Sequence, residues 1–433
     1  MLETTRRDTD TPAQDWAWAE ATVWTERMLA ALENGVQGGK WYSLLDKVYR
    51  PEVLTAAWRR VRRNKGAAGV DRIGIKRFES HAQRHLEELH SDLKTGRYQP
   101  QPVRRLEIPK GDGKTRPLGI PTVKDRVVQA AVKSVIEPIF DKEFLSMSHG
   151  FRPGRGCKDA LREVDHGLKA GYHWVVDTDI QGYFDNISHQ QLMHRIEERI
   201  SDGRVLGLIE EFLTQEILTE AKCWTPTQGT PQGAVLSPLL ANIYLHSLDQ
   251  KMREEGHQMV RYADDFVILC QTRAQAERAL QTVRDWMEQN GLTLHPDKTH
   301  IGNCLEQGQG FEFLGYRFEA GRRLVRRKSM NKLREAIRER TRRRPGKSLK
   351  RIIAELNPVL RGWYGYFKHA SRWTFPTVDA FVRRRLRGIL LKQNKRKGTG
   401  NGKSHAYRWP NAFFAERGLF TLKEAHALAS QSR

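Results

Sequence analysis

The sequence contains few cysteines and no long apolar stretch. Only four of its 433 residues are cysteine, and they lie far apart. Four cysteines so far apart suggest neither a disulfide framework nor a paired-cysteine zinc module. No apolar stretch approaches the ~20 residues of a membrane-spanning helix, and the first residues lack the apolar core of a signal peptide. We therefore expect an intracellular protein with reduced thiols.

Acidic residues are scarce in the last quarter of the chain, and this scarcity sets its charge. The whole sequence has 74 Lys and Arg against 51 Asp and Glu, a net charge of +23. Residues 321–433 hold 31 basic and 6 acidic side chains, whereas residues 1–320 hold 43 and 45. A basic excess of this size predicts a polyanionic partner, either a nucleic acid or a membrane surface. We expect this polyanionic partner to bind the segment after residue 320.

Strands are expected only before residue 321. There the expected strands are 103–108, 116–120, 173–180, 259–262, 266–270 and 311–318, and the expected helices are 41–63, 76–95, 124–140, 190–200, 204–218, 235–251 and 274–290. After residue 320 the expected elements are three basic helices, 328–343, 348–367 and 378–392. The pattern predicts an α+β first part and an all-α second part.

Two adjacent carboxylates stand at the tip of an expected hairpin, in Tyr262-Ala263-Asp264-Asp265. Neighbouring carboxylates repel each other unless a cation lies between them, and Mg²⁺ prefers such oxygen ligands. Asp179, at the end of another apolar strand, offers a third carboxylate, although Asp177 lies on the same strand face at period two. On this local pattern alone, a metal site and an ordinary acidic turn both remain open.

A series of motifs in a fixed order is more specific than the turn alone. The motifs are Arg104-Arg105-Leu106-Glu107-Ile108-Pro109-Lys110 with Arg116-Pro117-Leu118-Gly119-Ile120-Pro121, Gly150-Phe151-Arg152-Pro153-Gly154-Arg155-Gly156, Asp179-Ile180-Gln181-Gly182-Tyr183-Phe184-Asp185, Gly229-Thr230-Pro231-Gln232-Gly233 with Leu236-Ser237-Pro238, Tyr262-Ala263-Asp264-Asp265, Leu294-His295-Pro296-Asp297-Lys298-Thr299 and Phe313-Leu314-Gly315-Tyr316. In this order they closely resemble the fingers and palm blocks of bacterial group II intron reverse transcriptases. Residues 64–71 resemble an extra N-terminal block of that family, and residues 349–387 resemble its maturase (thumb) domain.

The resemblance covers about residues 41–425 and implies an α+β right-hand polymerase with an antiparallel sheet, followed by an all-α basic thumb. It divides the chain into an N-terminal extension (1–40), fingers and palm (41–320), a thumb or maturase domain (321–394) and a basic tail that resembles a DNA-binding segment (395–433). Many family members carry a C-terminal endonuclease domain with paired cysteines and histidines. Because this sequence shows no such pattern, it resembles the endonuclease-lacking type.

The resemblance also implies a catalytic site. Asp179 and Asp264 would bind two Mg²⁺ ions with the help of the Ile180 carbonyl, and Asp265 would complete the acidic cluster. Two metal ions in such a site activate a hydroxyl and stabilise the leaving phosphate oxygens.

Four residues would contact the incoming nucleotide by the same resemblance. Phe184 would lie under the sugar and exclude a 2′-hydroxyl, Gln232 would contact the nucleotide, and Lys110 and Arg116 would bind its triphosphate. An ordinary core aromatic remains the alternative for Phe184, and a solvated turn lysine the alternative for Lys110.

Two basic runs would contact RNA phosphates. They consist of Arg342, Arg343 and Arg344, and of Arg383, Arg384 and Arg385. The alternative is a solvated basic face.

The implied function is an RNA-directed DNA polymerase and maturase. It would bind its group II intron RNA, assist splicing and copy the intron from dNTPs at a DNA target during retrohoming, as a cytoplasmic bacterial protein without a membrane partner. A domesticated or defence-associated reverse transcriptase and a non-enzymatic splicing factor remain alternatives, and the latter would be expected to have a degraded acidic cluster. An RNA-dependent RNA polymerase is disfavoured by Phe184. The sequence does not predict whether the protein is a monomer or a dimer.

Overall fold

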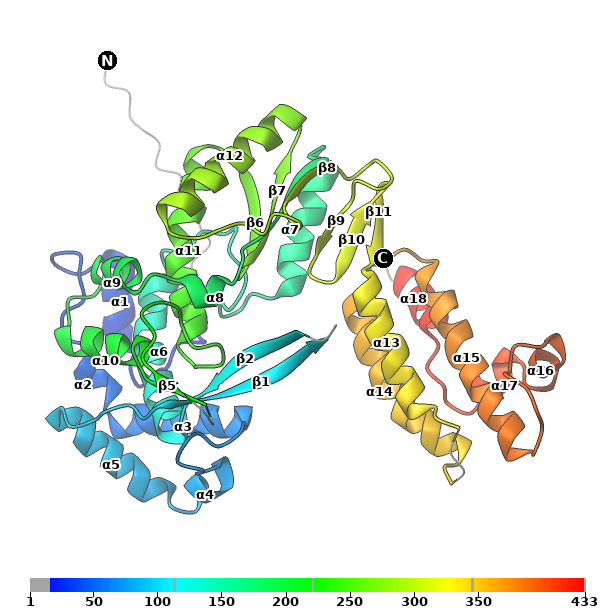
Figure 1. Cartoon of the computed structure of the whole chain (residues 1–433), viewed down its shortest axis with the longest axis horizontal. Helices are drawn as coiled ribbons and strands as arrows, with labels where there is room; N and C mark the ends of the chain where they lie inside the picture. Colours follow the sequence, from blue (N-terminus) through cyan, green and yellow to red (C-terminus); the bar gives the residue numbers. More distant parts are fainter. Residues whose placement is uncertain (1–15, 112–113, 220–221, 344–345, 432–433) are drawn as a thin grey trace. The chain divides into compact units, whose positions relative to one another are not determined.

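The computed structural model describes residues 16–111, 114–219, 222–343 and 346–431 (Figure 1). These residues form two compact units. Unit 1 comprises the chain up to His166 together with Thr178–Leu269 and Ala274–His300, and unit 2 comprises Gly167–Asp177, Cys270–Arg273 and the chain from Ile301 onward. The boundary therefore passes inside strand β3 (Trp174–Asp179).

Unit 1 contains most of the helices around a largely apolar core. They are α1 (Glu26–Asn34), α2 (Leu45–Val48), α3 (Pro51–Asn64), α4 (Ile75–Glu79), α5 (Ala82–Thr95), α6 (Val123–Asp141), α7 (Cys157–Lys169), α8 (Tyr183–Asn186), α9 (His189–Glu197), α10 (Gly203–Leu213), α11 (Ser237–Glu254) and α12 (Arg273–Gln289). Helix α6 is buried along almost its whole length, including polar side chains such as Asp125 and Gln129. The Thr122 hydroxyl caps it by accepting from the Asp125 amide.

One sheet of unit 1 is a long hairpin extended by two short strands. Its order is β2 (Lys114–Ile120), β1 (Val103–Gly111), β4 (Ile217–Leu218) and β5 (Cys223–Trp224). In the antiparallel pair, Ile108 lies opposite Arg116 and Arg105 lies opposite Gly119. Residues directly opposite each other share a face, and faces alternate along a strand. Arg116 and Arg105 are therefore on opposite faces of the hairpin.

A second sheet has the order β6 (Gln258–Tyr262), β7 (Asp265–Cys270), β3 and β8 (His300–Asn303). Strands β6 and β7 form an antiparallel hairpin in which Tyr262 faces Asp265. Residues 266–270 of β7 are all buried, and α11 packs against β6. The acidic turn is thus mounted on rigid, buried strands.

Unit 2 contains a three-stranded sheet and the remaining helices. The sheet has the order β11 (Arg322–Val325), β10 (Tyr316–Glu319) and β9 (Phe311–Phe313). The helices are α13 (Arg327–Arg340), α14 (Leu349–Phe367), α15 (Thr374–Gln393), α16 (Lys403–Arg408), α17 (Asn411–Ala415) and α18 (Leu422–Gln431). None of the helices in the described part of the chain has the length and apolar character that spanning a membrane requires.

The α+β class and the helical C-terminal region are confirmed, but several elements differ from their sequence predictions. The single strand expected at 311–318 is a hairpin, because Leu314 and Gly315 both take positive φ, +48° and +84°, and reverse the chain. The helix expected at 204–218 ends at Leu213, and its last residues form β4. Helix α7 has no counterpart among the predicted elements.

Candidate active site

Asp264 and Asp265 lie where the β6–β7 hairpin turns. Only Ala263 and Asp264 stand between the paired residues Tyr262 and Asp265. Ala263 takes a φ of +62°, a left-handed conformation that costs a non-glycine residue about 1–2 kcal/mol. Such a conformation persists only where the surroundings hold it, so the direction of Asp264 is fixed by what lies beneath the turn.

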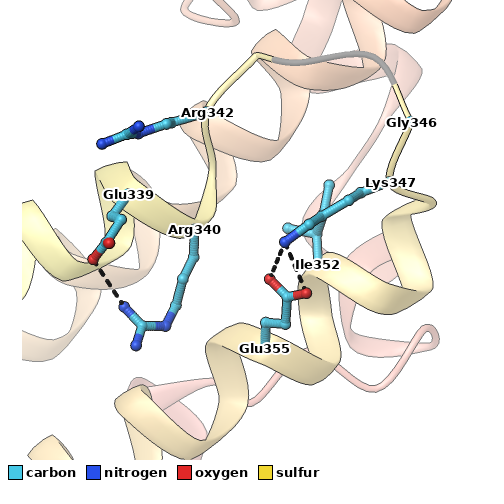
Figure 2. Close-up of a pocket in the computed structure, with 7 residues that line it drawn as sticks. All are labelled: Glu339, Arg340, Arg342, Gly346, Lys347, Ile352 and Glu355. Carbon is cyan, nitrogen blue, oxygen red and sulfur yellow. Dashed lines mark hydrogen bonds and ion pairs between the residues drawn. The ribbon is translucent and has the colours of Figure 1, made fainter.

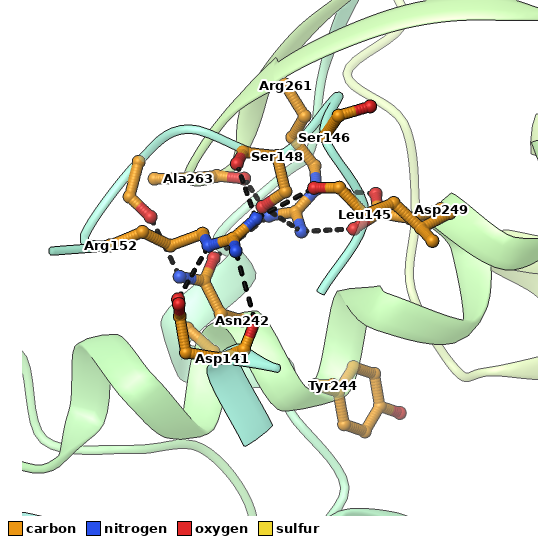
Figure 3. Close-up of polar contacts among 12 residues, drawn as sticks. Asp141, Leu145, Ser146, Ser148, Arg152, Asn242, Tyr244, Asp249, Arg261 and Ala263 are labelled. Atoms are coloured by element: carbon orange, nitrogen blue, oxygen red, sulfur yellow. Dashed lines mark hydrogen bonds and ion pairs between the residues drawn. The ribbon is translucent and has the colours of Figure 1, made fainter. Parts of the chain in front are cut away.

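A buried arginine lies beneath the turn (Figure 3). Arg261 Nη1 donates to the Ala263 carbonyl at 2.9 Å and to Asn242 Oδ1 at 3.0 Å, and Nη2 donates to Ser148 Oγ at 2.8 Å. Its charge is balanced by Asp249, with Nε 2.7 Å from Oδ1. Both side chains of this ion pair are 0% exposed. Because a buried charge needs hydrogen bonds as well as a counter-ion, this network fixes the turn at several points.

The Gly150–Gly156 motif packs directly on the turn. A Cβ atom on Gly150 would lie 2.2 Å from the Ala263 amide nitrogen, so only glycine allows this approach. Two residues later, Arg152 donates from Nε to Asp141 Oδ1 at 2.7 Å and from Nη1 to the Ser148 carbonyl at 3.0 Å. Figure 3 shows that this second arginine lies beside the first. The motif therefore acts as a buried support for the acidic turn.

Asp179 stands at the end of β3 within unit 1. Its carbonyl accepts from the His295 amide at 2.7 Å, and its Oδ2 accepts from Lys298 Nζ at 2.8 Å. Asp177, the alternative from the sequence, belongs to unit 2, where it accepts from the Glu312 amide at 3.2 Å. Asp177 thus has a backbone partner within unit 2, whereas Asp179 belongs to unit 1, which also contains the acidic turn.

The electrostatics of Asp264 link it to Asp179. Burial raises the pKa of Asp264, the nearby charge of Asp179 raises it further, and Arg116 lowers it. A buried carboxylate beside a second carboxylate favours a cation close to it. In the described part of the chain, no three His, Cys, Asp or Glu side chains form a ready-made metal cage. Mg²⁺ suits such a site, since it takes one or two carboxylates and completes its shell with water and substrate phosphates. Ile180 follows Asp179 with its side chain buried and forms an antiparallel bridge with Leu294.

Phe184 and Gln232 are brought together in one cavity of about 350 Å³. Two backbone hydrogen bonds hold the loop that carries Gln232. The Thr230 amide donates to the Phe184 carbonyl at 2.7 Å, and the Gly119 amide donates to the Gln232 carbonyl at 2.7 Å. The Gln232 amide also donates to Asp185 Oδ1 at 3.3 Å. Residues far apart in the sequence therefore meet where the nucleotide contacts are expected.

Arg116 and Lys110 lie on the β1–β2 hairpin. Arg116 is exposed, and its charge acts on Asp264. Lys110 is part of β1, but its side chain falls outside the described part of the structure.

Comparison with known proteins gives the family. Residues 108–318 match the family described as reverse transcriptase (RNA-dependent DNA polymerase), and residues 330–409 match the group II intron, maturase-specific domain. Protein YkfC of Escherichia coli K12 is 35% identical over 316 residues, which span 63% of this chain and 82% of YkfC. The chain belongs to the reverse transcriptases that carry a group II intron maturase domain. A member of this family is an RNA-directed DNA polymerase.

Other relatives of this reverse transcriptase are similar over smaller shares of their length. The group II intron-encoded protein LtrA of Lactococcus lactis subsp. cremoris is 41% identical over 202 residues, which span 46% of this chain and 33% of LtrA. Among solved structures, a partial Cas6-RT-Cas1–Cas2 complex is 25% identical over 57% of this chain and 41% of that chain, with a TM-score of 0.35.

The second basic run of this reverse transcriptase lies on α15 and is partly engaged within unit 2. Arg383, Arg384 and Arg385 are all half-buried. Arg385 donates to the Thr341 carbonyl at 2.7 Å and to its hydroxyl at 2.9 Å, and the Arg384 guanidinium stands 5.3 Å from the Phe381 ring centroid. Arg385 therefore also fastens α15 to the end of α13.

The first basic run follows α13 and is more accessible. Arg342 and Arg343 are exposed, and Arg342 lines a cavity of about 830 Å³ (Figure 2). Lys347 and Glu355 form an ion pair at 2.7 Å in the wall of that cavity. Arg344 lies outside the described residues.

Sequence reasoning missed the buried supports of the acidic turn. Arg261, Asp249, Asn242 and Ser148 were not expected to act together, because 113 residues separate Arg261 from Ser148. The available signal is an arginine within an otherwise apolar strand, since a charge at such a position needs a buried counter-ion. Lys298 belongs to a recognised motif, but nothing in the sequence places it on Asp179.

Proposed function

We propose that this reverse transcriptase extends a DNA primer on an RNA template by two-Mg²⁺ nucleotidyl transfer, with Asp179 and Asp264 as metal ligands. The observation that carries the proposal is that Asp179 and the acidic turn stand at the ends of the neighbouring strands β3 and β7, and burial together with the nearby charge of Asp179 raises the pKa of Asp264. The Ile180 carbonyl and Asp265 lie next to these ligands in the chain and would complete the oxygen-rich site. Bound Mg²⁺ would supply charge neutralisation and activation of the attacking hydroxyl.

The chain's own residues would bind and orient the substrates. Arg116 and Lys110 would hold the triphosphate of a dNTP, for which the planar guanidinium of arginine is well suited. Phe184 would contact the sugar and sterically exclude a 2′-hydroxyl. Gln232 would contact the nucleotide from a loop that hydrogen bonds hold in place. Strand ends and short hydrogen-bonded loops are appropriate mounts, because nucleotidyl transfer depends mainly on positioning.

The test is primer extension by a protein in which Asp264 and Asp265 are both replaced by Ala. Extension with dNTPs is expected to fall about 10²–10³-fold, the loss seen when a main charge-stabilising group is removed, while intron RNA binding stays close to that of the wild type. Because the turn backbone is retained, circular dichroism is expected to be unchanged. Primer extension by the double variant at the wild-type rate would show that the metal assignment is wrong.

We further propose that the basic segments bind the group II intron RNA from which the protein comes, assist its splicing and support its insertion at a DNA target. The proposed boundaries remain an extension (1–40), fingers and palm (41–320), a thumb or maturase domain (321–394) and a tail (395–433). Residues 321–433 hold 31 basic and 6 acidic side chains. This excess of positive charge supports a phosphate-binding role for the two basic runs, Arg342, Arg343 and Arg344, and Arg383, Arg384 and Arg385.

Salt dependence tests the RNA-binding proposal. Replacing Arg342 and Arg343 by Gln is expected to lower the slope of log affinity against log salt by about 1.4–1.8, since each lost phosphate contact removes about 0.7–0.9. The matched control is Arg162→Gln, an arginine in unit 1 whose side chain is 75% exposed. An unchanged slope in the double variant, or an equal change in the control, would refute this assignment.

A further inference from the structure

Phe151 is a strained residue within the motif that supports the acidic turn. Its φ is +61°, a left-handed conformation that is unfavourable for a bulky side chain. Both of its neighbours are fixed in place. A Cβ atom on Gly150 would lie 2.2 Å from the Ala263 amide nitrogen, and Arg152, which is 6% exposed, forms an ion pair at 2.7 Å (Figure 3). Such conformations persist only where the surroundings hold them, and they concentrate at functional sites.

The Phe151 side chain adds little to the apolar core of unit 1. It is 43% exposed, and the guanidinium of the next residue, Arg152, lies over the Phe144 ring instead, 5.4 Å from its centroid. Glycine would adopt the same φ without strain, so the backbone of the motif does not need a phenylalanine. A large exposed ring at a strained position indicates that the ring binds something other than unit 1.

Phe151 lies at the same edge of unit 1 as the acidic turn. The segment before it runs parallel to β6, since Ser148 forms a parallel bridge with Arg261 and the His149 amide donates to the Arg261 carbonyl at 2.9 Å. Strand β6 leads into the acidic turn, and the parallel segment leads into Phe151. Parallel segments that pair in register reach the same edge. A substrate that lies on the acidic turn is therefore within reach of the ring.

The substrate that reaches this edge is a duplex of RNA template and DNA primer. Its primer ends at the metal ions that Asp179 and Asp264 would bind, so its terminal base pairs lie over the turn. A duplex that contains an RNA strand is A-form, with a deep, narrow major groove that side chains cannot read and a wide, shallow minor groove. A rigid aromatic ring that projects from a surface fits the shallow groove, where it covers the apolar faces of the sugars.

We propose that Phe151 packs in the minor groove of the primer–template duplex at its terminal base pairs and so positions the primer end over the acidic turn. Arg155, in the same motif, donates from Nη1 to the Ser146 carbonyl at 2.6 Å and supplies a positive charge that suits the phosphates beside the groove. The inference rests on the proposed function, because it takes the acidic turn as the place where the primer ends.

The test measures duplex binding by the full-length protein, with fluorescence anisotropy of a labelled RNA template annealed to a DNA primer and without dNTPs. Phe151→Gly removes the ring together with the strain. We expect the affinity for the duplex to fall about 3- to 9-fold, the effect of losing the burial of the 43% of the side chain that the groove would cover. Hydrogen exchange of β6 peptides should not become faster, since glycine suits the φ. Phe151→Tyr keeps the ring and should bind as the wild type does, as should Tyr42→Ala, the control at another exposed aromatic residue of unit 1.

Three results would overturn the inference. Wild-type affinity in Phe151→Gly would show that the ring does not contact the duplex, and an equal loss of affinity for single-stranded RNA of the same length would show that it does not recognise the groove. Faster exchange of β6 peptides in Phe151→Gly would assign the ring to the stability of the fold. Duplex binding needs no catalysis, so the proposed metal site is tested separately. If Phe151→Gly loses duplex affinity while the variant with Ala at both Asp264 and Asp265 still extends primers, the metal site fails and the Phe151 contact stands.

Discussion

Replacing Asp249 by Asn removes the negative charge that faces the buried Arg261 guanidinium. Both side chains are 0% exposed and are joined by bonds of 2.7 and 2.5 Å. The substitution keeps one acceptor oxygen but turns an amide donor toward the guanidinium. Breaking one side of a buried ion pair costs about 3–5 kcal/mol, so unit 1 should lose a large part of a typical domain stability.

A second substitution separates stability from positioning. The double variant Arg261→Met and Asp249→Leu leaves no unpaired buried charge, and such replacements are far less costly than a broken pair. It does remove the donor to the Ala263 carbonyl, so the acidic turn loses its support. We therefore expect the double variant to be more stable than Asp249→Asn. We nevertheless expect it to extend primers poorly, because the acidic turn is no longer held.

Stability is best read by hydrogen exchange of peptides from α11 and β6, because two units need not unfold together. Primer extension with dNTPs reports on the turn. Arg162→Met is the control, since its side chain is 75% exposed and surface substitutions usually stay within about 0.5 kcal/mol. If Asp249→Asn loses less than about 1 kcal/mol, the network does not carry the energy assigned to it. If the double variant polymerises normally, the turn does not depend on Arg261.

Three further predictions concern other contacts. Gly150→Ala should abolish primer extension because its Cβ would lie 2.2 Å from the Ala263 nitrogen, whereas Gly156→Ala, whose Cβ would meet only a side-chain atom at 3.8 Å, should remain active. Phe184→Ala should raise incorporation of NTPs relative to dNTPs at least tenfold in single-nucleotide assays, and an unchanged ratio would contradict its role beside the sugar. Glu88→Gln should lower stability at pH 7 by about 0.2–1 kcal/mol, the range of partly exposed pairs. The hydrogen bond from Lys124 lowers the pKa of Glu88 from 4.5 to about 2. A lowered carboxyl pKa stabilises the fold above pH 4.5 and loses this effect as the pH falls towards 2. The difference between Glu88→Gln and wild type in urea midpoints should therefore vanish near pH 2.

The sequence was sufficient for the elements whose signal is local. The β6–β7 hairpin and helices such as α6, α11 and α14 follow from alternating or helical apolar patterns. The hairpin at Leu314-Gly315 was missed, because the apolar residues on both sides of it read as one continuous strand. The local pattern also does not distinguish Asp177 from Asp179, since period two puts both on one strand face.

The acidic residues of the proposed site are recognisable in the sequence, whereas their buried supports are not. Asp179 and Asp264 stand at strand ends in recognisable motifs. Arg261, Asp249 and Ser148 come from three separate segments, and no pattern within a single segment indicates that they meet. Tertiary contacts of this kind depend on the packing of α11 against β6, which a one-dimensional pattern does not contain.

The separation between Ser148 and Arg261 has a consequence for synthesis of the protein. A ribosome adds about 5–20 residues per second, so the 113 residues between them take roughly 6–23 s. During that interval the nascent chain already contains Gly150 and Arg152 but has no acidic turn for them to support. The partner of Asp249 arrives only with β6. An incomplete chain therefore lacks both the acidic turn and the Arg261 guanidinium beneath it, so we expect this buried network to form only after β6 has been synthesised.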